Sequence, residues 1–162
     1  MASPTLMSGP ITLSWGHSME AYLADKLVNE TEAVADAFQR LIDKDDNLAK
    51  VKFTLAEIAK DPALVERKIR ELRTIQYHNL AKVDAVYNIT LGIRILNLAQ
   101  EKPTLFRAVM LRHDCVHRSG FDKDGNELKV LTKSFVQDTA DLIKAFVENI
   151  EKAVRARSSS RL

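Results

Sequence analysis

The residues with the clearest chemical capacity lie together at positions 112–120, in the segment Arg-His-Asp-Cys-Val-His-Arg-Ser-Gly. The guanidinium of Arg112 carries a permanent charge and can hold a phosphate through two parallel N–H groups. An imidazole such as that of His117 can donate or accept a proton near neutral pH. Together the two side chains supply the groups that phosphodiester cleavage needs when no metal ion takes part.

Arg112 and His117 fall near the end of a predicted helix. Lys102, Pro103 and Thr104 indicate its start, and Gly120 permits a left-handed exit. The negative end of the helix dipole favours a protonated imidazole in the last turn, where His117 lies. Five residues place the two side chains about 140° apart around an ideal helix, so a second chain or an opened helix end would have to bring them together.

Helical spacing of apolar residues continues through most of the chain. It predicts helices over residues 19–41, 61–97, 102–120 and 132–156, and a capping box at Thr54 and Glu57 predicts a short extra helix over 55–60. Turn residues at 122–126, flanked by Phe121, Leu128 and Val130, predict a small hairpin before the last helix. We therefore expect an all-α fold: an antiparallel up-and-down four-helix bundle with a short extra helix and that hairpin.

The organisation along the chain is that of one domain. We expect an irregular lead-in at residues 1–18, a helical domain at 19–156 and a frayed tail at 157–162, because the lead-in is rich in Ser, Pro and Gly and the tail in Ser. Several apolar residues exceed what a small four-helix core needs, and they predict an apolar interface between two copies of the chain. They are Leu91, Ile95, Leu98 and Phe106.

Composition restricts the class of protein. Apolar residues make up 46% and charged residues 28% of the chain, with a net charge of only +2, which argues against a constitutive nucleic-acid scaffold. The single cysteine, Cys115, cannot form an internal disulfide, and no metal-ligand spacing surrounds it. No apolar stretch approaches the roughly 18 residues of a membrane span. We expect a soluble, cytoplasmic protein without a metal or other cofactor.

The motif and its place in the helix order resemble the HEPN superfamily of toxins, antiviral proteins and RNA-processing factors. The hallmark of that family is Arg, four residues and His, with a polar residue after the Arg, and Arg112, His113 and His117 match it. The resemblance extends to residues 76–83 on the preceding helix and to the turn at 122–126, and it covers roughly residues 19–153.

The resemblance implies a homodimer in which two motifs face each other across a cleft. It implies a metal-independent endoribonuclease in which the ribose 2′-hydroxyl attacks the adjacent phosphate, so that RNA is cleaved and DNA is not. By this analogy Arg112 stabilises the pentacoordinate phosphate, His117 moves the proton and His113 orients them. Regulation would come from an antitoxin or a fused sensor domain. Ser119 stands where members paired with a nucleotidyltransferase antitoxin carry Tyr, which argues against that pairing.

Three further residues are weaker candidates for binding substrate. Arg118 could contact a phosphate, although a surface charge, in an ion pair with Asp114 four residues before it, is the simpler explanation. His78 and Asn79 belong to the helix that the resemblance places beside the motif, and they could extend the site. A packing or surface role is the simpler explanation for a single helical histidine.

Two other functions fit the same sequence features. The chain could be a catalytically silent HEPN-like module that binds nucleotide, RNA or a protein partner, as one domain of a larger protein. It could also be a plain helical dimerisation domain. In the dimerisation domain Arg112 and His117 would be dispensable. A purely structural explanation of the two residues is that Arg112 pairs with a carboxylate and His117 bonds the terminal carbonyls of its helix.

Overall fold

The computed structural model describes residues 10–44, 50, 52–70, 74–117, 121, 123–126 and 132–159. Its helices are α1 (Pro10–Ala33), α2 (Ala35–Lys44), α3 (Leu55–Lys60), α4 (Leu64–Arg70), α5 (Leu80–Leu91), the short 3-10 helix η2 (Ile95–Leu98), α6 (Lys102–His117) and α7 (Lys133–Ser159). In these parts of the chain the only β structure is an isolated bridge at Phe121. The predicted all-α class is confirmed.

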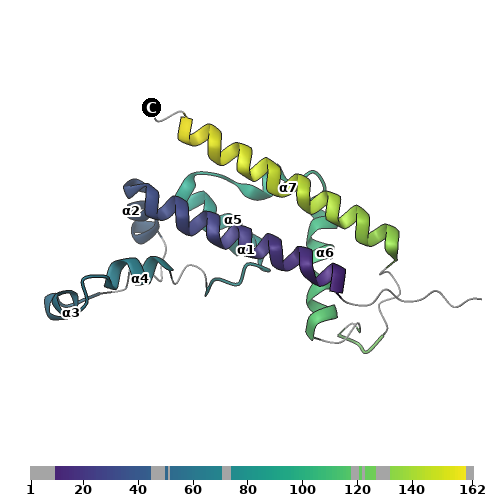
Figure 1. The fold of residues 1–162 in the computed structure, drawn as a ribbon, viewed down its shortest axis with the longest axis horizontal. Coiled ribbons are helices and arrows are strands. Elements are labelled where there is room, and N and C mark those ends of the chain that lie inside the picture. The colour runs from purple at the N-terminus through teal and green to yellow at the C-terminus, as the bar shows by residue number, and fades with distance from the viewer. Residues whose placement is uncertain are drawn as a thin grey trace, which may run out of the picture.

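Helices α1 and α7 lie side by side and run in the same direction (Figure 1). Tyr22 near the middle of α1 bonds Glu151 of α7, and Ser18 one turn earlier lines a groove with Ala140. An up-and-down order would make the first and last helices antiparallel, so the arrangement differs from the sequence expectation at this pair. The connection between α6 and α7, residues 118–132, is longer than the roughly 2 to 8 residues that join neighbouring helices in a bundle.

The core lies where α1, α2, α5, η2, α6 and α7 meet. Its largest fully buried side chains come from all six elements and include Tyr87, Phe146, Met19, Leu23, Leu27, Leu41, Leu80, Ile95 and Leu105. The helix α3 stands apart from this core, and all of its residues are exposed (Figure 1). None of the helices in the described segments is long and apolar enough to cross a membrane.

The first predicted helix is two helices in the structure. α1 begins at Pro10, so residues 10–18 are helical and not an irregular lead-in. The backbone breaks at Val34, and α2 starts there with bonds from the Ala37 and Phe38 N–H groups to the Val34 carbonyl. The break lets α2 turn back and bury Ala37 and Leu41 against α5.

The helix predicted over 61–97 is also divided, into α4, α5 and η2. Asn79 starts α5 by accepting a bond from the Lys82 N–H group, and Gly92 ends it at φ 70°, where a left-handed residue terminates the helix. The buried carboxylate of Asp84 then accepts from the Leu96 N–H group at 2.9 Å and pairs with Arg94 at 3.0 Å. These contacts turn the chain towards α6.

Several local predictions are confirmed. Thr54 and Glu57 form the capping box of α3, and Thr132 caps α7 through the Phe135 N–H group. Gly125 adopts φ 82° in the predicted turn.

Leu128 and Val130 of the predicted hairpin lie outside the described residues. α7 continues to Ser159, so residues 157–159 are helical and not frayed.

Candidate functional site

Helix α6 carries the motif and has two different faces. Leu105, Ala108 and Val109 are buried in the core, whereas Phe106 and Met110 are 37% and 68% exposed. Positions 106, 110 and 117 fall within about 40° of each other around a helix, so His117 continues the exposed apolar face. We call Phe106, Met110 and His117 the outer stripe of α6. His117 is exposed and is the last residue of the helix.

The outer stripe retains only part of the predicted apolar interface. Leu91 and Ile95 are 2% and 0% exposed, so both belong to the core and neither can meet a second copy. Leu98 is partly buried against the same core. Of the four residues expected at an interface, Phe106 is the one that the structure leaves exposed, and Met110 joins it.

Arg112 lies on the other side of α6. Its Nη1 donates to Oε1 of Glu20 on α1, and the two side chains are 19% and 20% exposed. The Nε atom of Arg112 is buried and has no hydrogen-bond partner among the described residues. Arg112 is therefore paired with a carboxylate, as the purely structural explanation of this residue expects.

The structure does not bring Arg112 and His117 onto one face. Arg112 is turned about 140° away from His117 around the helix axis and faces the seam between α1 and α6. The separation is the one expected from the spacing in the sequence, so a second chain or an opened helix end would have to bring the two groups together. Glu20 was missed by sequence reasoning, because its partner lies 92 positions away and no local pattern connects them.

The other predicted site residues fall into two groups. His113 lies in α6, but its side chain is outside the described part of the structure, as is the whole of Arg118. His78 and Asn79 are exposed in the turn before α5, not within a continuous long helix. The Lys82 N–H group donates to the side-chain oxygen of Asn79 at 3.2 Å. Asn79 therefore has a structural role as the cap of α5.

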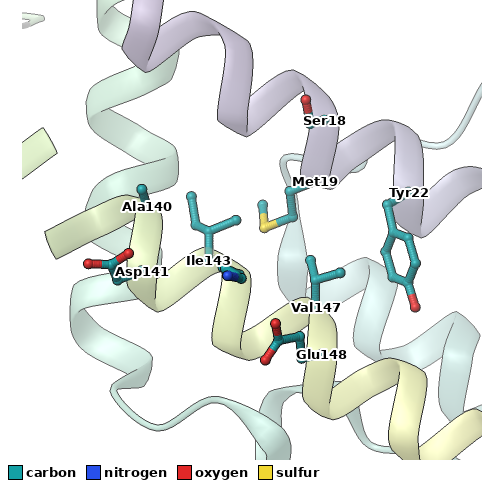
Figure 2. Close-up of a pocket in the computed structure, with 9 residues that line it drawn as sticks. Ser18, Met19, Tyr22, Ala140, Asp141, Ile143, Val147 and Glu148 are labelled. Atoms are coloured by element: carbon teal, nitrogen blue, oxygen red, sulfur yellow. The ribbon is translucent and has the colours of Figure 1, made fainter. Parts of the chain in front are cut away.

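A groove of about 410 Å³ separates part of α1 from α7 (Figure 2). Met19 and Ile143 point toward each other across it, and Val147 and Tyr22 continue the lining. The lining is mainly apolar and includes neither Arg112 nor His117. In the described residues, no group of His, Cys, Asp and Glu side chains is arranged to hold a metal ion.

Beside the groove, Glu151 joins α1 to α7. It accepts from the Tyr22 hydroxyl at 2.7 Å and pairs with Lys26 at 3.1 Å and Arg155 at 2.9 Å. The Tyr22 bond is the main cause that lowers the pKa of Glu151 to about 2, and burial and this same bond raise the pKa of Tyr22. A carboxylate that is this strongly engaged holds helices together and is poorly suited to accept a proton in catalysis.

Neither family models, nor curated proteins, nor solved structures match this chain. The features that bear on function are therefore those of the motif in α6: the exposed His117 at the helix end, the covered Arg112, and the Glu20 carboxylate that pairs with Arg112.

Proposed function

We propose that the chain is a metal-independent endoribonuclease of HEPN type that acts as a toxin or antiviral effector in the cytoplasm. The observation that supports this most is the position of His117, exposed at the carboxyl end of α6 and following Arg112 on the same helix. An imidazole at this position can donate the proton that a leaving alkoxide needs.

In the proposed reaction, the ribose 2′-hydroxyl attacks the adjacent phosphorus and the bond to the 5′-oxygen breaks. The products are a 2′,3′-cyclic phosphate and a 5′-hydroxyl. Arg112 stabilises the additional negative charge of the pentacoordinate phosphate, and His117 moves the proton between the two oxygens. His113 orients these groups, and Arg118, His78 and Asn79 are candidates for contacts with the rest of the RNA.

The active form in this proposal is a homodimer built on the outer stripe of α6. Phe106 and Met110 present apolar surface next to His117, so an isologous contact through them would place the two motif helices against each other. In such a dimer one cleft is lined by groups from both chains. Arg112 and His117 of different chains can then act together, although they are about 140° apart around the helix within one chain.

Helices α1, α5, α6 and α7 share one core, but the parallel course of α1 and α7 replaces the up-and-down order. An antitoxin or a fused sensor domain would supply the regulation, and RNA is the expected macromolecular substrate.

A catalytically silent HEPN-like module is the second candidate. The pairing of Arg112 with Glu20 favours it, because a neutralised guanidinium attracts a phosphate less strongly. Such a module would bind nucleotide, RNA or a protein partner without cleaving RNA.

One experiment separates the two candidates. Purified protein is incubated in excess chelator with labelled single-stranded RNA and with DNA of the same sequence. The nuclease proposal expects cleavage of the RNA alone, with products that end in 2′,3′-cyclic phosphate. Intact RNA at high protein concentration, or cleavage only after a divalent ion is added, would leave the binding module as the better description.

A further inference from the structure

The contact between Arg112 and Glu20 is unusual in its geometry. An arginine and a carboxylate form their strongest pair when two parallel N–H groups meet two oxygens. Among the described residues, Nη1 donates to Oε1 of Glu20, while Nε is buried without a hydrogen-bond partner. Arg112 is thus covered by protein but incompletely satisfied in this state.

Because protein covers most of the Arg112 side chain, its charge needs an anionic partner. Its side chain is 19% exposed, and removing the partner of a partly buried charge is strongly unfavourable. A phosphodiester offers oxygens of the same kind as a carboxylate, and it can accept two N–H groups at once. A phosphate can therefore take the place of Glu20 and satisfy more of the guanidinium than Glu20 does.

We propose that Glu20 is an internal competitor of the substrate phosphate for Arg112. In the unliganded chain Glu20 holds the guanidinium at the seam of α1 and α6, away from the outer stripe that carries His117. A phosphate of the bound RNA replaces Glu20, and the long side chain of Arg112 then turns towards it. The inference rests on the proposed function for its substrate, and it makes the unliganded site a restrained one.

The opposite role for Glu20 would be that of a support, which keeps Arg112 oriented for catalysis. The two roles differ in the sign of their effect. Loss of a competitor strengthens binding of a phosphate-containing ligand through Arg112, whereas loss of a support weakens it or leaves it unchanged. A binding measurement that does not depend on cleavage therefore decides between them.

The test uses Glu20→Gln, which removes the charge and keeps the size of the side chain. Asp25→Asn is the matched control, because it makes the same change in net charge at an exposed position of α1. The probe is a fluorescent single-stranded 2′-deoxy oligonucleotide, which cannot undergo 2′-hydroxyl attack. We expect the Kd of Glu20→Gln to fall about tenfold relative to the control, a change typical of removing one coupled charge contact.

The gain in affinity for the oligonucleotide must depend on Arg112. In the double variant Glu20→Gln with Arg112→Ala, we expect the Kd to match that of Arg112→Ala alone. An equal Kd for Glu20→Gln and Asp25→Asn, weaker binding by Glu20→Gln, or a gain that persists without Arg112 would each overturn the proposal. If Glu20→Gln does not fold, Glu20→Asp serves instead, because its shorter side chain weakens the contact and should give a smaller gain of the same sign.

Failure of the nuclease proposal and failure of the competition proposal give different results. If the wild-type protein leaves RNA intact in chelator but Glu20→Gln binds the oligonucleotide more tightly through Arg112, the competition stands and the nuclease does not. If the wild-type protein cleaves RNA and Glu20→Gln shows no gain, the nuclease stands and the competition does not.

Discussion

The hydroxyl of Tyr22 donates a hydrogen bond of 2.7 Å to Oε2 of Glu151. The two residues are 129 positions apart in the sequence, and their bond joins α1 to α7. Lys26 from α1 and Arg155 from α7 complete the surroundings of the same carboxylate. Because α1 also carries Glu20, this bond helps to hold in place the helix that faces Arg112.

Tyr22→Phe should lower the free energy of unfolding by about 1.5 kcal/mol, the usual net contribution of a hydrogen bond to a charged group. Tyr87→Phe is a useful comparison, because the Tyr87 hydroxyl donates to the uncharged Leu23 carbonyl at 2.7 Å. We expect a smaller loss there, near about 1 kcal/mol. Urea denaturation at neutral pH measures both. An unchanged stability of Tyr22→Phe would mean that the bond contributes nothing net.

Acid should lower the free energy of unfolding over a defined range of pH. The Tyr22 bond, and then Arg155 and Lys26, lower the pKa of Glu151 from its usual 4.5 to about 2. A folded-state pKa below the unfolded value stabilises the fold above the unfolded pKa, and this stability is lost as the pH falls through the folded pKa. The side chain is 27% exposed, so we expect on the order of 1 kcal/mol after solvent screening.

The control for the acid range is Glu151→Gln. Its stability should change less than that of the wild type between about pH 4.5 and pH 2, because the variant lacks the titrating group. Denaturation curves at several pH values test this. Parallel pH profiles for the two proteins would assign the acid sensitivity to other carboxylates.

Gly92→Ala should destabilise the chain by about 1 kcal/mol, because Gly92 has φ 70° and a β-carbon disfavours the left-handed region. An added β-carbon would meet no atom within 4 Å, so the cost is one of backbone strain alone. Gly92→Asn should cost less, since Asn tolerates this conformation better. Thermal melts would show the order, and equal losses for Ala and Asn would contradict it.

Arg112→Ala and His117→Ala should each reduce RNA cleavage by about 10² to 10⁴ fold. They should differ in stability. His117 is exposed, so its removal should change the free energy of unfolding by no more than about 0.5 kcal/mol. Loss of Arg112 leaves the covered Glu20 carboxylate without its counter-charge, which should cost about 1 to 3 kcal/mol.

Two assays check this pair of variants, a gel of labelled RNA in chelator and a urea titration. Glu20→Gln combined with Arg112→Ala should recover part of the lost stability, because the uncompensated carboxylate is then absent. Cleavage that survives in both single variants would remove the motif from the mechanism.

Met110→Glu should prevent dimerisation, because it places a charge in the centre of the outer stripe. Leu55→Glu on α3 is the matched control, since Leu55 is also highly exposed but lies far along the chain from α6. Sedimentation velocity at micromolar concentration distinguishes the two variants. A wild-type protein that sediments as a monomer, or a Met110→Glu variant that remains dimeric, would contradict an interface on this stripe.

Local signals in the sequence predict local features of the fold well. The caps at Thr54 and Thr132 and the turn at Gly125 are correct, because each depends on side chains within a few residues of one another. The apolar spacing also identifies α6 and α7 correctly. The break at Val34 could not be predicted this way, since no Gly or Pro marks it and it is stabilised by packing of α2 on α5.

The candidate site is predictable only in part for the same reason. The spacing of Arg112 and His117 gives their angular separation in advance. It does not reveal that Glu20 covers Arg112, because that contact depends on how α1 and α6 cross. The directions of α1 and α7 were likewise beyond reach, since apolar periodicity identifies a helix face but not the course of the chain between helices.

The parallel pairing of α1 and α7 has a consequence for how the protein is made. Synthesis proceeds from the amino end, so the apolar face of α1 leaves the ribosome long before residues 133–159 exist to cover it. Contacts between such distant segments also slow folding compared with bundles built from neighbouring helices. During translation, the exposed face of α1 should therefore be a binding site for chaperones, and folding should be completed only after α7 has emerged.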